Sequence, residues 1–523
     1  MKFELLKTIR ERGLLLEKDI FDLLNSFDDV RLAKDFLEGL ERFSGQKIIT
    51  RSTLTKNFEY VQNIVSKLPG ENKSLVEKIF VKLGLQLEIT KEKQISNKNL
   101  GENTKKQSFQ VECFDTSVTK KIEVSDFVGS FRARYQQLQR ILMNRPELQQ
   151  NLVSINKISN NRQSHSIIAI VTEKRITKNK NMIIKFEDLT GEINGLVKFE
   201  NEEVFKKADE LLLDDIVGVK ASGNRDLLFI HDIFYPDSFI NQRVKFEEDI
   251  CIAFLSDLHV GSKMHLQSNL EKFLEWLNSG DETAKKIRYL FFVGDNVDGV
   301  GVFPGQEEVL ILKSMKEQYE QLAYYLRKVP KIITMFLCPG QHDASRVAEP
   351  QPLLDRDYAG PLYDIDNLVL VTNPATIRIF EKDKEFKVLM YHGASIHSFI
   401  NGIPELREIK AHKSPAKAVK HMLKRRHLAP MHSNVTYIPN AEKDPLVISE
   451  VPDILATGEV HRLDIENYNG TLIITGSCWQ SQTPFEEKVG NVPDPCKVPV
   501  FNLKTRELKI FDFSGEVERK NEH

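Results

Sequence analysis

The sequence is short of cysteine, of long apolar runs and of any excess of charge of one sign. Its five cysteines among 523 residues form no CxxC pair, which argues against a zinc ribbon or a disulfide framework and suits a reducing compartment. No apolar run approaches the roughly 18 residues that a membrane-spanning helix needs. The 73 basic and 75 acidic residues nearly cancel, so any contact with a polyanion must come from a local patch.

The first residues, MKFELLKTIRERG, carry charges inside their apolar stretch and lack the hydrophobic region of a secretion signal. Together with the lack of a membrane span, this pattern predicts a cytoplasmic protein. A chain of 523 residues is too long for one ordinary hydrophobic core, so we expect about two to four domains.

Three segments with different patterns precede residue 246. Residues 1–87 show apolar residues at helical spacing and predict a helical module. Residues 88–125 are polar and rich in lysine, which is typical of a flexible linker. Residues 126–245 predict a helix followed by strand, strand, strand, helix, strand and strand, the order of a small OB-like β-barrel.

Barrels of this type can bind single-stranded nucleic acid through a basic groove and stacked aromatic side chains. Phe186, Phe199 and Phe229 are the candidate stacking residues. Because aromatic residues are sparse on these strands, packing inside the barrel is the favoured interpretation of the same side chains.

Apolar runs alternate with helical segments over residues 246–523, which predicts an α/β domain with two packed sheets. Potential metal ligands follow these apolar runs. In chain order the motifs contain Asp257 and His259, Asp295 and Asp298, Gln341 with His342 and Asp343, His392, and lastly Glu459 and His461. Each motif alone is weak. Five in order, each after an apolar run and beside a glycine or a turn, are a strong signal for a metal site at the strand ends.

The order SDLH, GDNVD, GQHD, YHG and GEVH resembles the calcineurin-like metallophosphoesterase superfamily over residues 249–500. The resemblance implies two divalent ions held about 3.5–4 Å apart by a bridging carboxylate. The mixed ligands suit Mn²⁺, Fe²⁺ or Zn²⁺ better than Mg²⁺, and Mn²⁺ is the ion we expect. By resemblance, the first ion would take Asp257, His259, Asp295 and His461, and the second Asp295, Gln341, His392 and Glu459.

The same resemblance implies that His342 is the catalytic group, which protonates the leaving oxygen or steadies the transition state. Asp298 and Asp343 would support the site without binding metal. The predicted fold class is therefore multidomain α+β: an N-terminal helical module, an OB-like β-barrel, and an α/β two-sheet metallophosphoesterase domain over residues 246–523.

Two positions depart from the superfamily pattern, and both fall on the second ion. Gln341 stands where the pattern has Asn, and Glu459 stands where it has His. Glutamine offers the same amide oxygen one methylene further out, and a carboxylate remains a competent ligand. Because the first ligand set and His342 match the pattern, the sequence favours a retuned second site over a decayed one.

The order of the segments, with PGQHDASRVAEPQP at 339–352 and GSCWQSQTPFEEKVG at 476–490, resembles the small subunits of archaeal DNA polymerase D. These belong to the B-subunit family of replicative DNA polymerases. The resemblance implies a metal-dependent 3′→5′ exonuclease acting on single-stranded or mismatched DNA ends. It also implies a large catalytic subunit as partner, in a heterodimer or larger assembly at the nucleoid.

Two alternatives stay open. The first is a non-catalytic scaffold subunit with a degraded second metal site, as in the eukaryotic relatives. The second is a stand-alone phosphodiesterase or phosphatase for small molecules, which the helical module, linker and barrel disfavour.

The segment SPAKAVKHMLKRRHLAP at 414–430 predicts a basic helix beside the site. Its candidate DNA-binding residues are Lys417, Lys420, Lys424, Arg425 and Arg426. Basic side chains beside a phosphoesterase cleft can guide a polyanionic strand. A solvated surface helix is the alternative interpretation.

Overall fold

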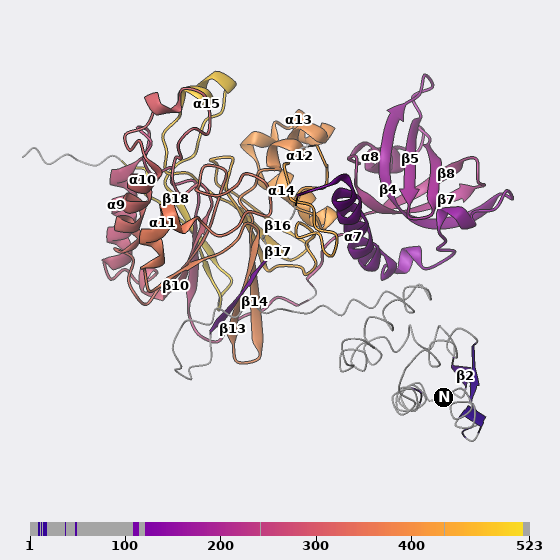
Figure 1. Cartoon of the computed structure of the whole chain (residues 1–523), viewed down its shortest axis with the longest axis horizontal. Helices are drawn as coiled ribbons and strands as arrows, with labels where there is room; N and C mark the ends of the chain where they lie inside the picture. The colour runs from indigo at the N-terminus through magenta and orange to yellow at the C-terminus, as the bar shows by residue number, and fades with distance from the viewer. Residues whose placement is uncertain are drawn as a thin grey trace, which may run out of the picture. The chain divides into compact units, whose positions relative to one another are not determined.

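The structure is a computed structural model, and it describes residues 108–114, 121–240, 242–433 and 435–515, with a few positions before residue 50. The chain divides into two compact units, 1–104 and 105–523. In the first unit, Leu15–Leu16 (β1) pairs in parallel with Ile48–Ile49 (β2) (Figure 1). The predicted helical module otherwise lies outside the described residues.

One segment inside the predicted linker forms a strand instead. Phe109–Cys113 (β3) pairs antiparallel with Ala375–Glu381 (β13) and adds an edge strand to a sheet. The Phe109 ring packs edge-on against Phe336, with ring centroids 5.1 Å apart. The linker prediction is therefore wrong for these five residues, because one large aromatic anchor and a strand partner outweigh the polar composition of their surroundings.

The second unit begins with the 20-residue helix Val124–Met143 (α7) and a closed barrel with strand order β4-β5-β6-β8-β7. The barrel elements are β4 (Gln163–Ile176), β5 (Met182–Asp188), β6 (Gly191–Val197), α8 (Glu202–Asp209), β7 (Ile216–Gly223) and β8 (Leu228–Phe234). This is the predicted order of strands and helix. The barrel closes because β6 and β8 pair in parallel.

The three aromatic side chains that were candidates for stacking have different surroundings. Phe186 is fully buried in the barrel core, in agreement with the packing interpretation of this side chain. Phe199 is 47% exposed, and Phe229 is half-buried with the Arg162 guanidinium 5.1 Å from its ring centroid.

Two six-stranded sheets pack face to face in the rest of the unit. The first has the order β12-β11-β10-β9-β18-β19, with β9 (Cys251–Leu255), β10 (Ile287–Val293), β11 (Thr334–Cys338), β12 (Leu368–Leu370), β18 (Lys497–Asn502) and β19 (Leu508–Asp512). The second has the order β16-β17-β15-β14-β13-β3, with β14 (Lys384–Met390), β15 (Ile454–Thr457), β16 (Asp464–Tyr468) and β17 (Thr471–Thr475).

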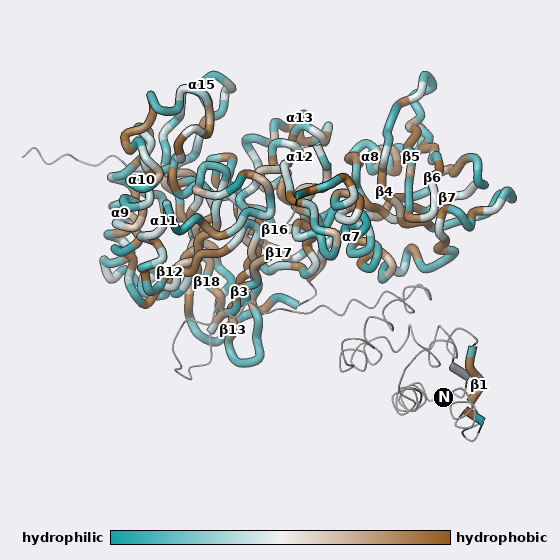
Figure 2. The backbone as a smooth tube through the Cα atoms, viewed as in Figure 1, coloured by the Kyte–Doolittle hydropathy of each residue, from teal (hydrophilic) through white to brown (hydrophobic). Residues whose placement is uncertain are grey.

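Helices cover the outer faces of both sheets (Figure 1). The first sheet carries α9 (Gln267–Asn278), α10 (Met315–Leu326) and α11 (Arg356–Tyr363), and the second carries α12 (Ile396–Gly402), α13 (Pro404–Glu408) and α14 (Ala416–Arg425). Because both faces of each sheet are covered, central strands such as β9 are apolar throughout, and Figure 2 shows brown, hydrophobic stretches near the labels β12, β18 and β3. Between the sheets, the rings of Phe254, Phe291 and Phe336 stack, with centroids 5.0 and 5.2 Å apart.

The C-terminal end of α14 joins the two-sheet body to the barrel. Arg425 is 3% exposed, and its Nε lies 2.9 and 3.1 Å from the carboxylate oxygens of Asp215 at the start of β7. Lys424 forms an ion pair with Glu210, and Arg426 donates to the carbonyl of Ile448. All three cationic side chains are therefore engaged by groups of the protein itself.

The DNA-binding prediction is therefore wrong for Lys424, Arg425 and Arg426. The sequence could not show that acidic groups of the barrel would meet this end of the helix. At the other end, Lys417 is exposed, whereas Lys420 lies 3.8 Å from a Glu466 oxygen. No helix within the described ranges has the length and apolar content to cross a membrane.

Candidate metal centre

The predicted site residues lie in loops at the C-terminal ends of five strands. The loops after β9, β10 and β11 are brought together because these strands are parallel neighbours in one sheet. The loops after β14 and β15 come from parallel neighbours in the other sheet. Contacts across the sheets, such as His392 Nε2 to Asp295 Oδ2 at 3.2 Å, show that both sets meet in one place.

Five of the predicted ligands have a left-handed backbone. Their φ angles are +53° for Asp257, +48° for His259, +49° for Asp295, +73° for Glu459 and +57° for His461. Residues other than glycine rarely adopt this backbone conformation. Each one costs about 1–3 kcal/mol of conformational strain and persists only where the surrounding structure enforces it. Strain of this kind concentrates at functional sites, and here it coincides with the donor residues.

Two glycines of the motifs are required by close packing. A Cβ on Gly294 would lie 2.2 Å from Nδ1 of His392, and one on Gly340 would lie 2.1 Å from Oδ1 of Asp295. Such distances are far below van der Waals contact, so only glycine fits at either position. The glycines of the GD and PG motifs therefore serve to bring the donor side chains together.

One cluster of donors consists of Asp257, His259 and His461. The Nε2 atoms of the two imidazoles face each other at 3.1 Å, and His461 Nε2 lies 3.6 Å from Asp257 Oδ1. His259 Nδ1 lies 3.2 Å from the Asp298 carboxylate, and His461 Nδ1 lies 3.0 Å from the Glu486 carboxylate. When each ring is neutral with its proton on Nδ1 for these acceptors, both Nε2 atoms present lone pairs to one point, which a cation fits.

A second cluster surrounds His392. Its Nδ1 donates to the carbonyl of Val293 at 2.8 Å, and its Nε2 lies 3.2 Å from Asp295 Oδ2 and 3.3 Å from Glu459 Oε2. Gln341 Nε2 donates to Glu459 Oε2 at 2.8 Å. The two positions that depart from the superfamily pattern thus contact each other and the predicted second ligand set.

Two oxygen atoms in these clusters are buried without a hydrogen bond, Oδ2 of Asp257 and Oε1 of Gln341, and His392 Nε2 has only the carboxylates of Asp295 and Glu459 as polar neighbours. Buried polar atoms in folded proteins nearly always have a partner, and those without one need an explanation. A divalent cation satisfies oxygen and imidazole nitrogen donors of this kind. The residues present therefore fit metal ions.

The charges of the site point the same way. Burial raises the pKa of Asp295, but the imidazoles of His392 and His342 outweigh it and hold the pKa well below its usual range. Burial lowers the pKa of His461, but the Glu486 hydrogen bond and the Asp257 charge raise it to about 9. The carboxylates thus favour positive charge at the imidazoles, as they would favour a cation between them.

His342 differs from the other histidines of the site. Its Nδ1 lies 2.6 Å from the carbonyl oxygen of Asp298, and its Nε2 lies 4.0 Å from Asp295 Oδ2. Its side chain is 21% exposed, whereas that of His392 is fully buried. With Nδ1 engaged by a carbonyl, Nε2 of this partly exposed ring is the nitrogen left for a substrate.

Asp298 and Asp343 lie behind the donors. Asp298 accepts from His259 and from Gln480 Nε2 at 3.1 Å, and Asp343 accepts from the backbone N–H of Gly340 at 2.9 Å. Asp343 also accepts from the Tyr319 hydroxyl at 3.0 Å. Both side chains orient neighbouring groups of the site.

Glu486 was missed by the sequence reasoning. It lies in Pro484–Val489 (α15) and forms a capping box with Thr483, whose Oγ1 accepts from the Glu486 N–H at 3.2 Å. The T-x-x-E spacing was a signal for a helix start. It could not show that the other carboxylate oxygen, Oε1, would reach His461, which is 25 residues earlier in the chain.

Glu349 is a further buried carboxyl close to the site. It is 1% exposed, and its Oε2 lies 3.1 Å from the Tyr391 hydroxyl, which also lies 3.2 Å from Ser395 Oγ. The tyrosine has one hydroxyl hydrogen for two contacts, so a protonated Glu349 that donates to Tyr391 lets both be hydrogen bonds. Burial raises the pKa of Glu349 to about 8.

Glu349 should therefore make the folded state less stable as pH rises. The folded carboxyl keeps its proton up to about pH 8, whereas the unfolded one releases it near the ordinary value of 4.5. Stability is thus fully present below about pH 4.5 and is lost toward pH 8, by on the order of 3 kcal/mol between pH 5 and pH 8. Urea unfolding at both pH values should show a drop in the native chain that is smaller by this amount in Glu349→Gln. Equal drops in the two chains would contradict the assignment.

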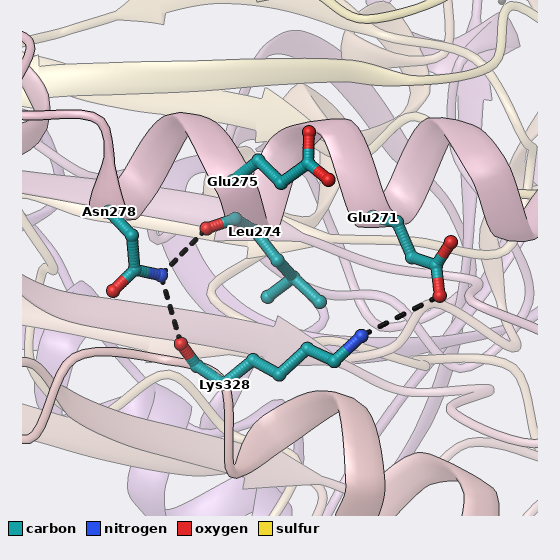
Figure 3. Close-up of a pocket in the computed structure, with 5 residues that line it drawn as sticks. All are labelled: Glu271, Leu274, Glu275, Asn278 and Lys328. Carbon is teal, nitrogen blue, oxygen red and sulfur yellow. Dashed lines mark hydrogen bonds and ion pairs between the residues drawn. The ribbon is translucent and has the colours of Figure 1, made fainter. Parts of the chain in front are cut away.

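A separate cavity lies between α9 and the end of α10, away from the metal centre (Figure 3). It has a volume of about 460 Å³ and is lined by Glu271, Leu274, Glu275, Asn278 and Lys328. Asn278 Nδ2 donates to the carbonyls of Leu274 and Lys328, and Lys328 lies 3.6 Å from Glu271. Its polar groups are largely satisfied by one another.

A family model that describes the B-subunit of DNA polymerases alpha and epsilon matches residues 252–463, the segment that contains every predicted metal ligand. The two-sheet body with its donor residues at the strand ends is therefore that of the B-subunit class of DNA polymerases. A DNA polymerase II small subunit of Pyrococcus furiosus is 38% identical over 407 residues, and one of Methanothermobacter thermautotrophicus is 35% identical over 398 residues. The chain belongs to the family of archaeal DNA polymerase II small subunits, which confirms the resemblance to the small subunits of an archaeal polymerase.

The match covers 76% of this chain and 65% of the Pyrococcus relative, and 75% of this chain and 80% of the Methanothermobacter relative. Among solved structures, an archaeal phosphodiesterase is similar at 13% identity, covering 50% of this chain and 99% of that chain, with a TM-score of 0.25.

Proposed function

We propose that this chain is a phosphodiester hydrolase that acts as a metal-dependent 3′→5′ exonuclease on single-stranded or mismatched DNA ends. It would do so as the small subunit of a two-subunit replicative DNA polymerase, bound to a large catalytic subunit in the cytoplasm, at the nucleoid. The observation that carries the proposal is the pair of facing Nε2 atoms of His259 and His461, 3.1 Å apart, beside buried donor atoms that make no hydrogen bond.

Two metal ions, with Mn²⁺ favoured by the mixture of imidazole and carboxylate donors, would be held by these residues. One would be held by Asp257, His259 and His461, and the other by His392, Gln341 and Glu459, with Asp295 contributing to both. When bound, such ions lower the pKa of water and stabilise the charge of a phosphoryl group.

His342 would supply the proton in this reaction. Burial lowers its pKa, but the Asp295 charge and the Asp298 carbonyl outweigh burial and raise it. The Asp298 carbonyl fixes one proton on Nδ1, so the second proton of the charged ring resides on Nε2. From there it can pass to the leaving oxygen of the cleaved phosphodiester.

The contact between Gln341 and Glu459 bears on the alternative, a non-catalytic scaffold subunit. Gln341 Nε2 occupies one Glu459 oxygen that a cation would otherwise use, which favours a weakened second site. Against this, Gln341 Oε1 is buried and unpartnered, and His392 is held in place by Val293. We therefore propose a retuned second site with hydrolysis retained.

The closed barrel is, in our proposal, an OB-like module of this protein. The strand and helix order supports this assignment, because it is the order of that fold. Its proposed role is to bind either DNA or the large subunit.

The test is Mn²⁺-dependent shortening of a 5′-labelled single-stranded DNA by the full chain, alone and with the large subunit. We expect shortening by the native chain, and loss of at least about 1000-fold in rate in Asp295→Asn, because the carboxylate shared by both donor clusters loses its charge. The double variant Gln341→Asn with Glu459→His should need less Mn²⁺ for half-maximal rate. Absence of cleavage by the native assembly, with cleavage by the double variant, would establish the scaffold.

A further inference from the structure

A strip of basic side chains begins at the edge of the metal centre. It consists of Lys410, Lys413, Lys417 and Arg462, which we call the basic rim. Arg462 directly follows His461, and its guanidinium donates to the carbonyl of Lys413 at 3.1 Å. Lys413 ends the short helix Ala411–Lys413 (η5), four residues before Lys417 in the first turn of α14.

Two imidazoles connect the rim to the donors of the second cluster. His397 Nε2 lies 3.8 Å from Glu459 Oε1, whereas Gln341 contacts the other oxygen of that carboxylate. The rings of His397 and His412 lie with centroids 5.4 Å apart and a tilt of 33°. Because His412 is part of η5, an unbroken set of contacts leads from Glu459 to the lysines of the rim.

The rim cations differ from those at the other end of α14. Lys424 and Arg425 are paired with Glu210 and Asp215. Within the described part of the chain, none of the four rim cations has a carboxylate within ion-pair distance.

The Asp464 carboxylate interacts electrostatically with Lys417 and Arg462, beyond ion-pair distance. Its oxygens accept the backbone N–H groups of Ala416 and Ile465, at 3.1 and 3.0 Å. It is thus engaged by the backbone, and the rim keeps an excess of positive charge.

We propose that the basic rim binds the phosphate backbone of a single DNA strand whose end enters the metal centre. A polyanion releases condensed counterions when it meets such cations, which makes binding favourable and dependent on salt. The rim extends from Arg462, next to the metal-centre residue His461, to the lysines of η5 and α14. A row of cations of this kind can follow the backbone of a single strand. This inference rests on the proposed function for its substrate.

The test uses the full chain in EDTA, so that no DNA is cleaved, and fluorescence anisotropy of a labelled 20-nucleotide single strand. The rim variant combines Lys410→Gln, Lys413→Gln and Lys417→Gln. The control variant combines Lys285→Gln, Lys331→Gln and Lys504→Gln, three exposed lysines outside the barrel, at the ends of the strands opposite the metal centre. Both variants remove three charges, so a general effect of net charge is the same in each.

We expect the rim variant to bind the strand about 10-fold to 100-fold more weakly at low salt, with a salt slope that is smaller by about 2. The control variant should bind like the native chain. Equal binding by the rim variant and the native chain, or weakening in the control alone, would overturn the proposal.

A second measurement separates this proposal from the proposed function. The ratio of kcat/KM for DNA to that for bis(4-nitrophenyl) phosphate, both with Mn²⁺, should fall about 10-fold in the rim variant. If the native chain hydrolyses neither compound but binds DNA through the rim, the hydrolase function is wrong and the rim stands. If it hydrolyses both and the ratio is unchanged in the rim variant, the rim is wrong and the hydrolase stands.

Discussion

Replacement of His342 by alanine is expected to slow metal-dependent cleavage of DNA by about 100-fold to 10,000-fold, the usual range for loss of a proton donor. The reason is that the His342 side chain is 21% exposed and its Nδ1 is held by the Asp298 carbonyl at 2.6 Å, which leaves Nε2 for the substrate. The measurement is single-turnover cleavage of 5′-labelled single-stranded DNA at saturating Mn²⁺. Metal content, measured by mass spectrometry, should be unchanged because His342 is not among the proposed ligands.

A matched control for this variant is His231→Ala. His231 is exposed on the barrel, and its Nε2 lies 2.7 Å from Ser222 Oγ, far in the sequence from the site. This change should leave the cleavage rate within about twofold of the native value. A His342→Ala rate as high as that of the control would remove His342 from the reaction.

Replacement of Asp215 by alanine is expected to lower the free energy of unfolding by about 3–5 kcal/mol. Its carboxylate accepts from Arg425 Nε at 2.9 and 3.1 Å, and the two side chains are 1% and 2% exposed. The variant leaves a buried guanidinium without its counter-charge, which is costly. Urea unfolding followed by circular dichroism measures the change.

Asp232→Ala is the control in the same barrel. Asp232 forms an ion pair with Lys207 at 2.8 Å, but the two side chains are 32% and 33% exposed. Water screens this pair, so its loss should cost no more than about 1 kcal/mol. The double change Asp215→Leu with Arg425→Met should recover much of the stability, because it removes both charges. Similar losses in Asp215→Ala and Asp232→Ala would show that burial does not strengthen the pair.

The donor residues could be predicted because each follows an apolar run, and parallel strand ends meet at one edge of a sheet. The structure brings together Asp257, Asp295, His392, Glu459 and His461 as that argument requires. Their roles as metal ligands stay a prediction. The local pattern sufficed here because strand ends are fixed by the backbone.

What the sequence could not show depends on partners distant in the chain. Arg425 and Lys417 are both basic residues of the same amphipathic helix. Arg425 is buried against Asp215, whereas Lys417 is exposed. Glu486 is separated from His461 by β16, β17 and the start of α15, and no periodicity reports their contact. The strand at Phe109–Cys113 depends on an edge of β13 that begins more than 260 residues later. Such contacts are set by tertiary packing and are invisible to windows of 10–20 residues.

Helix α14 has ten residues, which makes it about 15 Å long. Its first turn carries Lys417 of the basic rim, and its last residue, Arg425, is buried against Asp215 of the barrel. A helix this short does not bend, so it acts as a rigid lever between the two. Any displacement of the rim by a bound strand must tilt the barrel or strain the Arg425–Asp215 pair. A strand bound at the proposed rim should therefore alter the angle of the barrel.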